Sequence, residues 1–264
     1  MRNSTSGWAA KMALQVHQFP CLNDNYGYLI RDEATGRVGT VDSPDAEAIL
    51  AQLGQLGWTL DLVLNTHWHA DHAGGNARLK EVTGAQIVGP QEVTRIAPLD
   101  RPLTEGETVS LGETRLDVLE TGGHTLGHIT YHDAADRIVF VGDTLFALGC
   151  GRVFEGTADQ MWTSLSRLAA LPDDTLVYCA HEYTASNARF ALSVDDSPAL
   201  KARAAEVFAA RERGEPTVPT RIGLEKAANP FLRAPQLKAA LGMAGATDVE
   251  AFAAVRKAKD GFKG

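Results

Sequence analysis

The chain has 264 residues, of which 44% are hydrophobic and 22% charged, and these proportions exclude a disordered or fibrous protein. Its formal net charge of −8, with no long basic block to offset it, argues against binding of nucleic acid. No apolar run approaches the roughly 18 residues that a membrane-spanning helix needs, so we expect no membrane partner.

The first 11 residues contain one early arginine but no apolar stretch of the kind found in signal peptides. We therefore expect residues 1–11 to be a disordered extension. The three cysteines, Cys21, Cys150 and Cys179, are an odd number and include no Cys-x-x-Cys pair, which argues against a disulfide framework and against a thiolate zinc site. We expect a reducing, cytoplasmic location.

From residue 12 to about residue 182, short β-rich runs alternate with helical patterns. The runs 26–31 and 37–42 flank the turn sequence Asp-Glu-Ala-Thr-Gly and predict a hairpin. Further strands are predicted at 60–65, 85–89, 115–120, 137–141 and 175–179. Apolar residues at i, i+3 and i+4 predict helices at 44–56, 75–82 and 158–171. These elements predict a layered core of strands and helices.

The chain becomes rich in alanine, arginine and glutamate after residue 182, and it has few β-branched runs there. Helices are predicted at 185–192, 198–213, 235–241 and 247–259. We therefore expect a catalytic domain over residues 12–182 and a helical domain over residues 183–264.

The most informative stretch is residues 66–75, Thr-His-Trp-His-Ala-Asp-His-Ala-Gly-Gly, which follows an apolar strand. In an extended segment His67 and His69 project to the same side, whereas Asp71 and His72 lie where the chain turns into a helix and can face a second point. Four potential ligands in six positions therefore predict two neighbouring metal sites. The spacing differs from His-Glu-x-x-His, which disfavours a helical zinc protease.

Three further candidate ligands follow apolar strands: His124, Asp143 and His181. Each has an ordinary structural explanation when it is considered singly, but together they would complete two coordination shells. With the His-x-His-x-Asp-His motif, they make the chain resemble the metallo-β-lactamase fold superfamily.

Additional segments resemble the glyoxalase II (hydroxyacylglutathione hydrolase) family within that superfamily, from about residue 12 onward. They are PCLNDNY at 20–26, GDTLF at 142–146, GCG at 149–151, FEG at 154–156, HEYT at 181–184, NPF at 229–231 and RKAKD at 256–260. The resemblance implies an α+β fold, a four-layer αββα sandwich followed by a C-terminal α-helical domain. It also implies hydrolysis of S-(2-hydroxyacyl)glutathione, typically S-D-lactoylglutathione, to D-lactate and glutathione in methylglyoxal detoxification.

The resemblance further implies a set of seven metal ligands: His67, His69 and His124 for the first metal, Asp71, His72 and His181 for the second, and Asp143 as the bridge. Its two carboxylates, Asp71 and Asp143, are the implied catalytic residues, and His128 is not a ligand. We expect two divalent ions, zinc first, with iron or manganese as alternatives because the same donors accept all three. Two such metals convert a bridging water into hydroxide near neutral pH, which suits attack on a thioester.

Five residues match positions that contact glutathione in the family: Arg152, Phe154, Tyr183, Arg256 and Lys259. Phe154 departs from the family pattern, in which tyrosine is frequent, and this removes one hydroxyl that could bind substrate. Arg256 and Lys259 are three residues apart in a predicted helix and therefore share a face. We expect a monomer that acts on a small-molecule thioester.

Other functions remain open from the sequence. A persulfide dioxygenase of the same fold would use one iron held by His67, His124 and Asp143. A β-lactamase or lactonase would leave the basic helical tail without a purpose, and a ribonuclease would need a basic surface. A catalytic cysteine and a non-catalytic metal-binding module are further alternatives, and metal stoichiometry separates the main candidates.

Overall fold

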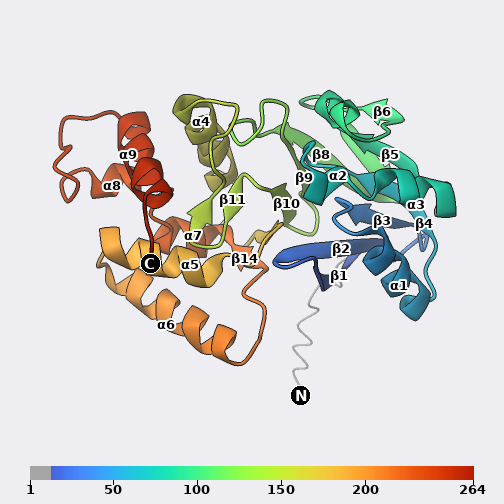
Figure 1. Ribbon diagram of the computed structural model, residues 1–264, viewed down its shortest axis with the longest axis horizontal. Helices are drawn as coiled ribbons and strands as arrows, with labels where there is room; N and C mark the ends of the chain where they lie inside the picture. Colours follow the sequence, from blue (N-terminus) through green and yellow to red (C-terminus); the bar gives the residue numbers. More distant parts are fainter. Residues whose placement is uncertain (1–12) are drawn as a thin grey trace, which may run out of the picture.

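Two six-stranded sheets lie face to face in the computed structural model, which describes residues 13–264, and helices cover their outer sides (Figure 1). The predicted extension, residues 1–11, lies outside the described residues. The strand order is β1-β2-β3-β4-β5-β6 in the first sheet and β14-β13-β10-β9-β8-β7 in the second. The α+β fold class and the four-layer arrangement predicted from the sequence are confirmed.

The strands are short, and their bounds are as follows. The first sheet contains β1 (Leu14–Cys21), β2 (Asn25–Asp32), β3 (Val38–Val41), β4 (Leu60–Leu64), β5 (Gln86–Gly89) and β6 (Arg101–Pro102). The second contains β7 (Thr108–Leu111), β8 (Thr114–Glu120), β9 (Ile129–Asp133), β10 (Ile138–Gly142), β13 (Leu176–Cys179) and β14 (Thr220–Arg221). A small separate hairpin consists of β11 (Leu145–Phe146) and β12 (Gly149–Cys150).

In the first sheet, β3, β4 and β5 run parallel. Parallel neighbours need crossover connections, and these are α1 (Ala46–Leu56) and the segment that contains the one-turn α2 (Ala70–Ala73) and α3 (Asn76–Thr83). The apolar sides of α1 and α3 pack on the outer face of the sheet. The carboxyl ends of the three strands therefore meet at one edge, where the His-x-His-x-Asp-His motif begins.

The second sheet packs its inner face against the first sheet and its outer face against α4 (Ala158–Ala169). Thr157 caps α4, since its side chain accepts from the backbone N–H of Gln160 while the Gln160 side chain accepts from the backbone N–H of Thr157. The buried Met161 and Leu165 of α4 belong to the same apolar cluster as the residues between the sheets. This cluster is the main core.

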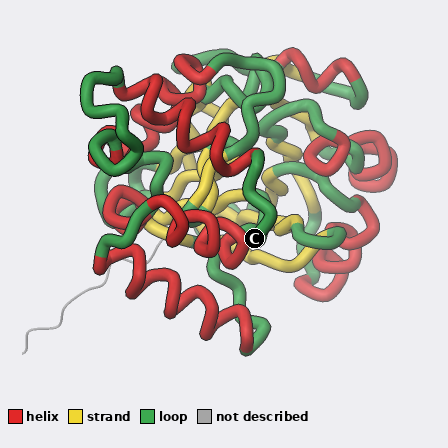
Figure 2. Tube along the Cα trace, turned by 60° about the vertical axis from the view of Figure 1, so that its left-hand side comes forward, coloured by secondary structure: helices red, strands yellow, loops and turns green. Residues whose placement is uncertain are grey.

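The C-terminal region is helical, as expected, and its helices, coloured yellow-orange to red, gather on one side of the molecule in Figure 1. In Figure 2, where this side comes forward, helices lie in front of the strands. Its elements are α5 (Thr184–Val194), α6 (Pro198–Glu212), α7 (Ile222–Ala228), α8 (Ala234–Leu237) and α9 (Asp248–Asp260). This region also supplies β14, which pairs antiparallel with β13. Phe252 of α9 lies 5.9 Å from Trp162 of α4, measured between ring centroids, so α9 is fixed against the sandwich.

Most predicted elements agree with the structure to within a few residues, including the hairpin of β2 and β3. The helix predicted at 235–241 is wrong beyond Leu237, because the chain continues in turns and reaches a left-handed conformation at Gly242, φ 69°. The division into domains at residue 182 stays a prediction.

Two further expectations concern the state of the cysteines and the absence of a membrane-spanning helix. Cys21, Cys150 and Cys179 are buried free thiols, and the predicted reducing compartment stays a prediction. None of the helices formed by residues 13–264 combines the length and the apolar character that a bilayer crossing requires.

Candidate metal centre and substrate cavity

The metal-binding motif begins directly after β4. Thr66 is anchored by Asp42, which follows β3: the Thr66 backbone N–H donates to Asp42 Oδ1 at 2.7 Å and its hydroxyl donates to Oδ2 at 2.9 Å. The extended backbone at His69 (φ −61°, ψ 150°) then leads into the single turn of α2. This change of direction separates the first two ligand candidates of the motif from the last two.

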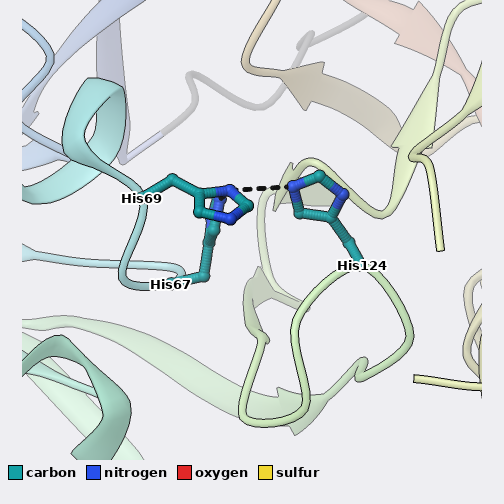
Figure 3. Close-up of side chains that lie close together, drawn as sticks. All are labelled: His67, His69 and His124. Atoms are coloured by element: carbon teal, nitrogen blue, oxygen red, sulfur yellow. Dashed lines mark hydrogen bonds between the residues drawn. The ribbon is translucent and has the colours of Figure 1, made fainter. Parts of the chain in front are cut away.

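Three imidazoles form the first cluster (Figure 3). His69 Nδ1 lies 3.0 Å from His67 Nε2 and 3.1 Å from His124 Nε2. His124 stands on the loop between β8 and β9, so the cluster joins the two sheets. Asp143, directly after β10, adds a carboxylate oxygen, since its Oδ2 lies 3.3 Å from His124 Nε2.

The second cluster contains Asp71, His72 and His181. The Nε2 atoms of His72 and His181 each lie 3.3 Å from Asp143 Oδ1 and 3.5 and 3.4 Å, respectively, from Asp71 Oδ2. The two oxygens of Asp143 therefore face different clusters. The clusters also adjoin directly, because His67, His72 and Asp143 form a group of their own with ligand atoms within 4.8 Å of one another.

This arrangement fits divalent metals. His72 Nε2 and Asp143 Oδ1 are buried and have no hydrogen-bond partner, which is costly for polar atoms unless something else satisfies them. A tetrahedral zinc with Zn–N distances of about 2.0–2.1 Å places its ligand atoms about 3.3 Å apart, and the atoms of each cluster have nearly this spacing. The donor types, imidazole and carboxylate, are those that zinc, iron and manganese accept.

Hydrogen bonds to the outer ring nitrogens direct the inner ones at the clusters. His72 Nδ1 lies 2.8 Å from Asp42 Oδ2, His181 Nδ1 lies 2.8 Å from Asp24 Oδ1, and His124 Nδ1 lies 2.8 Å from the Arg152 carbonyl. Each acceptor requires a proton on Nδ1, which leaves the lone pair of Nε2 free for a metal. Asp24 and Asp42 were not predicted from the sequence, although Asp42 follows a strand just as the ligand candidates do.

The imidazoles of the two clusters differ in their pKa values. Burial lowers the pKa of His67, His69 and His124, so these rings are neutral and suited to metal binding. Burial would also lower the pKa of His72, but the carboxylates of Asp143 and Asp42 raise it well above the usual value. A metal bound at the second cluster would therefore have to displace a proton from His72.

His128 lies behind Asp143 and outside the clusters. It is fully buried, its Nε2 accepts from the Asp143 backbone N–H at 3.1 Å, and its Nδ1 lies 3.0 Å from the Thr121 hydroxyl. Gly142 allows this close approach: its φ is 47°, and a Cβ atom there would come within 2.6 Å of His128 Nε2 and Thr66 Oγ1. His128 thus holds the backbone of Asp143 in place.

A cavity of about 450 Å³ opens beside the clusters. His124 and Asp143 form its inner end, and residues of α5 and α9 form much of its wall. All five residues predicted to contact substrate line it: Arg152, Phe154, Tyr183, Arg256 and Lys259. The Phe154 ring is 61% exposed and lies 5.2 Å from the His124 ring, and the Tyr183 ring stacks on His181 at 4.6 Å.

The two basic residues of α9 have different surroundings. Arg256 is buried, and its guanidinium donates to the Cys150 carbonyl at 2.9 Å and to Asp260 Oδ1 at 2.8 Å. Lys259 Nζ donates to the Ser186 carbonyl at 3.2 Å and, among residues 13–264, forms no ion pair with a carboxylate. Burial and the nearby Arg256 lower the pKa of Lys259 to about 8. Within the described residues, Lys259 is therefore the cation without a carboxylate partner, whereas Arg256 is paired with Asp260.

Both parts of the chain match known families. Residues 38–181 match the metallo-beta-lactamase superfamily, and residues 182–262 match the hydroxyacylglutathione hydrolase C-terminus. A hydroxyacylglutathione hydrolase from Maricaulis maris is 54% identical, over 94% of this chain and 99% of its own length. The chain belongs to the hydroxyacylglutathione hydrolase family. It is therefore an enzyme, and the resemblance seen in its sequence motifs is confirmed.

Other relatives agree with this assignment. A hydroxyacylglutathione hydrolase from Erythrobacter litoralis is 52% identical, over 94% of this chain and 100% of its own length. Among solved structures, ETHE1 from Myxococcus xanthus is 30% identical, with a TM-score of 0.65 over 92% of this chain and 90% of that one. TTHA1623 in a di-iron-bound form is 26% identical, with a TM-score of 0.59 over 83% of this chain and 100% of that one.

Proposed function

We propose that this hydroxyacylglutathione hydrolase acts through a binuclear metal centre, with S-D-lactoylglutathione as its typical substrate and zinc as the first candidate metal. The observation that carries the proposal is the position of Asp143, whose two oxygens face separate clusters. The proposed ligands are His67, His69 and His124 for one metal, Asp71, His72 and His181 for the other, and Asp143 for both. The di-iron form of TTHA1623 supports two metals on this fold and keeps iron as an alternative.

When bound, two divalent metals supply a water with a pKa near neutrality and a Lewis acid for the thioester carbonyl. The chain's own residues would hold the metals and neutralise part of their charge. The carboxylates of Asp71 and Asp143 offset half of the four positive charges of two dications, so the site stays electrophilic. The leaving group is a thiolate whose pKa is about 8.5, and it departs with less need of protonation than an amine.

The cavity provides the binding energy for glutathione. At neutral pH the glutathione moiety carries two carboxylates and one ammonium group, and a chain of net charge −8 must present local cations to hold it. Arg152, Arg256 and Lys259 supply these cations, and the rings of Phe154 and Tyr183 flank the path to the metals. The thioester can then reach the centre from the cavity's inner end, beside His124 and Asp143.

The test combines elemental analysis with activity. Metal-loaded enzyme should contain two metals per chain and should hydrolyse S-D-lactoylglutathione, followed as loss of the thioester absorbance, equally well with and without oxygen. A chelator should abolish the activity. A maximum of one metal per chain, together with oxygen consumption on glutathione persulfide and no thioesterase activity, would instead establish the persulfide dioxygenase. In that reaction the second cluster would have no ligand role.

We further propose that the enzyme acts as a monomer, because both clusters and the whole cavity lining come from one chain. Light scattering coupled to gel filtration tests this. A stable dimer whose dissociation abolishes activity would contradict it.

A further inference from the structure

Glu155 joins three loops beside the first cluster. Its Oε1 accepts from the Trp68 indole N–H at 3.1 Å and from Arg95 Nη1 at 2.7 Å, and its Oε2 accepts from the Leu126 backbone N–H at 3.1 Å. The Glu155 side chain is only 22% exposed. One carboxylate therefore contacts three residues that lie 29 to 87 positions from Glu155 in the sequence.

The segments joined by Glu155 are those that carry the first cluster. Trp68 stands between His67 and His69, and Leu126 follows His124 by two residues. The backbone adds to the same connection, since the Glu155 N–H donates to the His124 carbonyl at 3.3 Å. Glu155 therefore contacts both loops that carry the three imidazoles of the first cluster.

A 3-10 helix, η1 (Gln91–Arg95), supports these loops from outside. The Arg95 guanidinium lies 4.9 Å from the centroid of the Trp68 ring, a cation–π distance. From the same helix, Glu92 accepts from the Thr125 hydroxyl at 2.6 Å and from the Gly127 backbone N–H at 2.7 Å. The loop of His124 is thus held from two sides.

Glu155 is ionised at neutral pH. Its partial burial would raise the pKa, but the hydrogen bonds from Leu126 and Arg95 lower it below the usual value. Hydrogen bonds to an ionised carboxylate are stronger than those between neutral groups. The bonds from Trp68, Arg95 and Leu126 to Glu155 are therefore of the stronger kind.

The second cluster has other supports. Asp42 contacts His72, Asp24 contacts His181, and the Asn25 side chain donates to Asp71 Oδ2 at 3.1 Å. Glu155 forms no hydrogen bond with any of these residues. Asp42 also holds Thr66, which contacts His67, whereas the side-chain contacts of Glu155 lie on the loops of the first cluster alone.

We propose that Glu155, through Trp68, Arg95 and Leu126, is a positioning residue specific to the first metal site. This inference rests on the proposed two-metal function. A side chain that supports metal ligands typically contributes 10- to 100-fold to metal affinity. Because Glu155 acts through the neighbours of the ligands, we expect Glu155→Ala to weaken zinc binding at the first site by about 10-fold and to leave the second site unchanged.

The experiment starts from zinc-loaded enzyme dialysed against graded chelator, with retained zinc measured by elemental analysis. Glu155→Ala should lose the zinc of the first site at about one-tenth of the chelator concentration that the wild type needs. Glu155→Gln, which keeps one acceptor oxygen, should lie between Glu155→Ala and the wild type. Glu105→Ala is the matched control, because Glu105 also accepts from an arginine, Arg167, and from a backbone N–H, that of Glu120. It should behave as wild type.

Two backgrounds assign the effect to one site. In His181→Ala, which keeps the first site, adding Glu155→Ala should lower zinc retention, whereas in His69→Ala, which keeps the second, it should change nothing. Trp68→Phe keeps an aromatic ring but removes the N–H donor, so it should weaken the first site; circular dichroism checks the fold of each variant.

The outcomes separate this inference from the proposed function. A wild type that never retains more than one zinc overturns the binuclear function. A wild type with two zincs, and a Glu155→Ala variant that matches Glu105→Ala or is equally weakened in both backgrounds, overturns the positioning role alone.

Discussion

Asp143 is the residue whose side chain faces both clusters. Its Oδ2 faces the first cluster and its Oδ1 the second, so Asp143→Ala should reduce the metal content from two per chain to nearly none. We expect kcat/KM to fall by more than about 100-fold, beyond what supporting residues usually contribute. His181→Ala should retain about one metal. Elemental analysis of the two purified variants checks this, and one retained metal in Asp143→Ala would show that the carboxylate does not bridge.

We expect Lys259 to make substrate binding depend on pH. Its pKa of about 8, lowered by burial and then by Arg256, means that the free enzyme loses this positive charge as the pH rises through 8, well below the usual range for lysine. KM for S-D-lactoylglutathione should therefore rise above about pH 8. Lys259→Arg stays charged and should abolish the rise. Measuring KM and kcat separately from pH 6.5 to 9.5 tests this, and an identical rise in Lys259→Arg would contradict it.

At the scale of elements, α9 both lines the cavity and fastens to the sandwich. Arg256 donates to the carbonyl of Cys150 in β12, while Lys259 faces Ser186 of α5. Arg256→Ala with Lys259→Ala should raise KM roughly 10-fold, because a hydrogen bond to a charged group contributes about 1.5–3 kcal/mol. kcat should stay close to that of the wild type.

The two single variants, Arg256→Ala and Lys259→Ala, separate the contribution of α9 to stability from its contribution to substrate binding. Arg256→Ala alone should also lower the free energy of unfolding by about 1–3 kcal/mol, since it leaves the buried Cys150 carbonyl without its donor. Lys259→Ala should not. The exposed Lys257 of the same helix is the control position. An unchanged KM in the double variant, measured at low salt where surface attraction is least screened, would place substrate recognition elsewhere.

Local sequence patterns predicted much of this arrangement, and long-range contacts account for what they missed. Residues 60–72 were predictable because an apolar strand followed by alternating histidines is a local signal. The strand β1 was not, since its state depends on pairing with β2 and its burial pattern lacks clear alternation. Likewise, Glu155 and Trp68 are 87 residues apart, and no periodicity indicates that they meet.

In the whole molecule, the clusters connect the two sheets. His67 follows β4 of the first sheet, whereas Asp143 and His181 follow β10 and β13 of the second. Metals held by these residues would therefore join the halves of the sandwich and would satisfy the buried, unpartnered His72 Nε2 and Asp143 Oδ1. Metal removal should then destabilise the entire fold as well as the active site.

The size of this effect follows from mass action. A ligand present at 1,000 times its dissociation constant stabilises the folded state by about 4 kcal/mol, and each kcal/mol shifts the Tm of a chain of roughly this size by about 2–4 °C. We therefore expect a chelator to lower the Tm of metal-loaded enzyme by at least about 10 °C in scanning calorimetry, since each of the two proposed metals contributes. Asp143→Ala, which should hold almost no metal, is the control, and chelator should leave its Tm unchanged. An equal decrease in Asp143→Ala would mean that the chelator acts elsewhere, and no decrease in the wild type would show that the metals do not hold the sheets together.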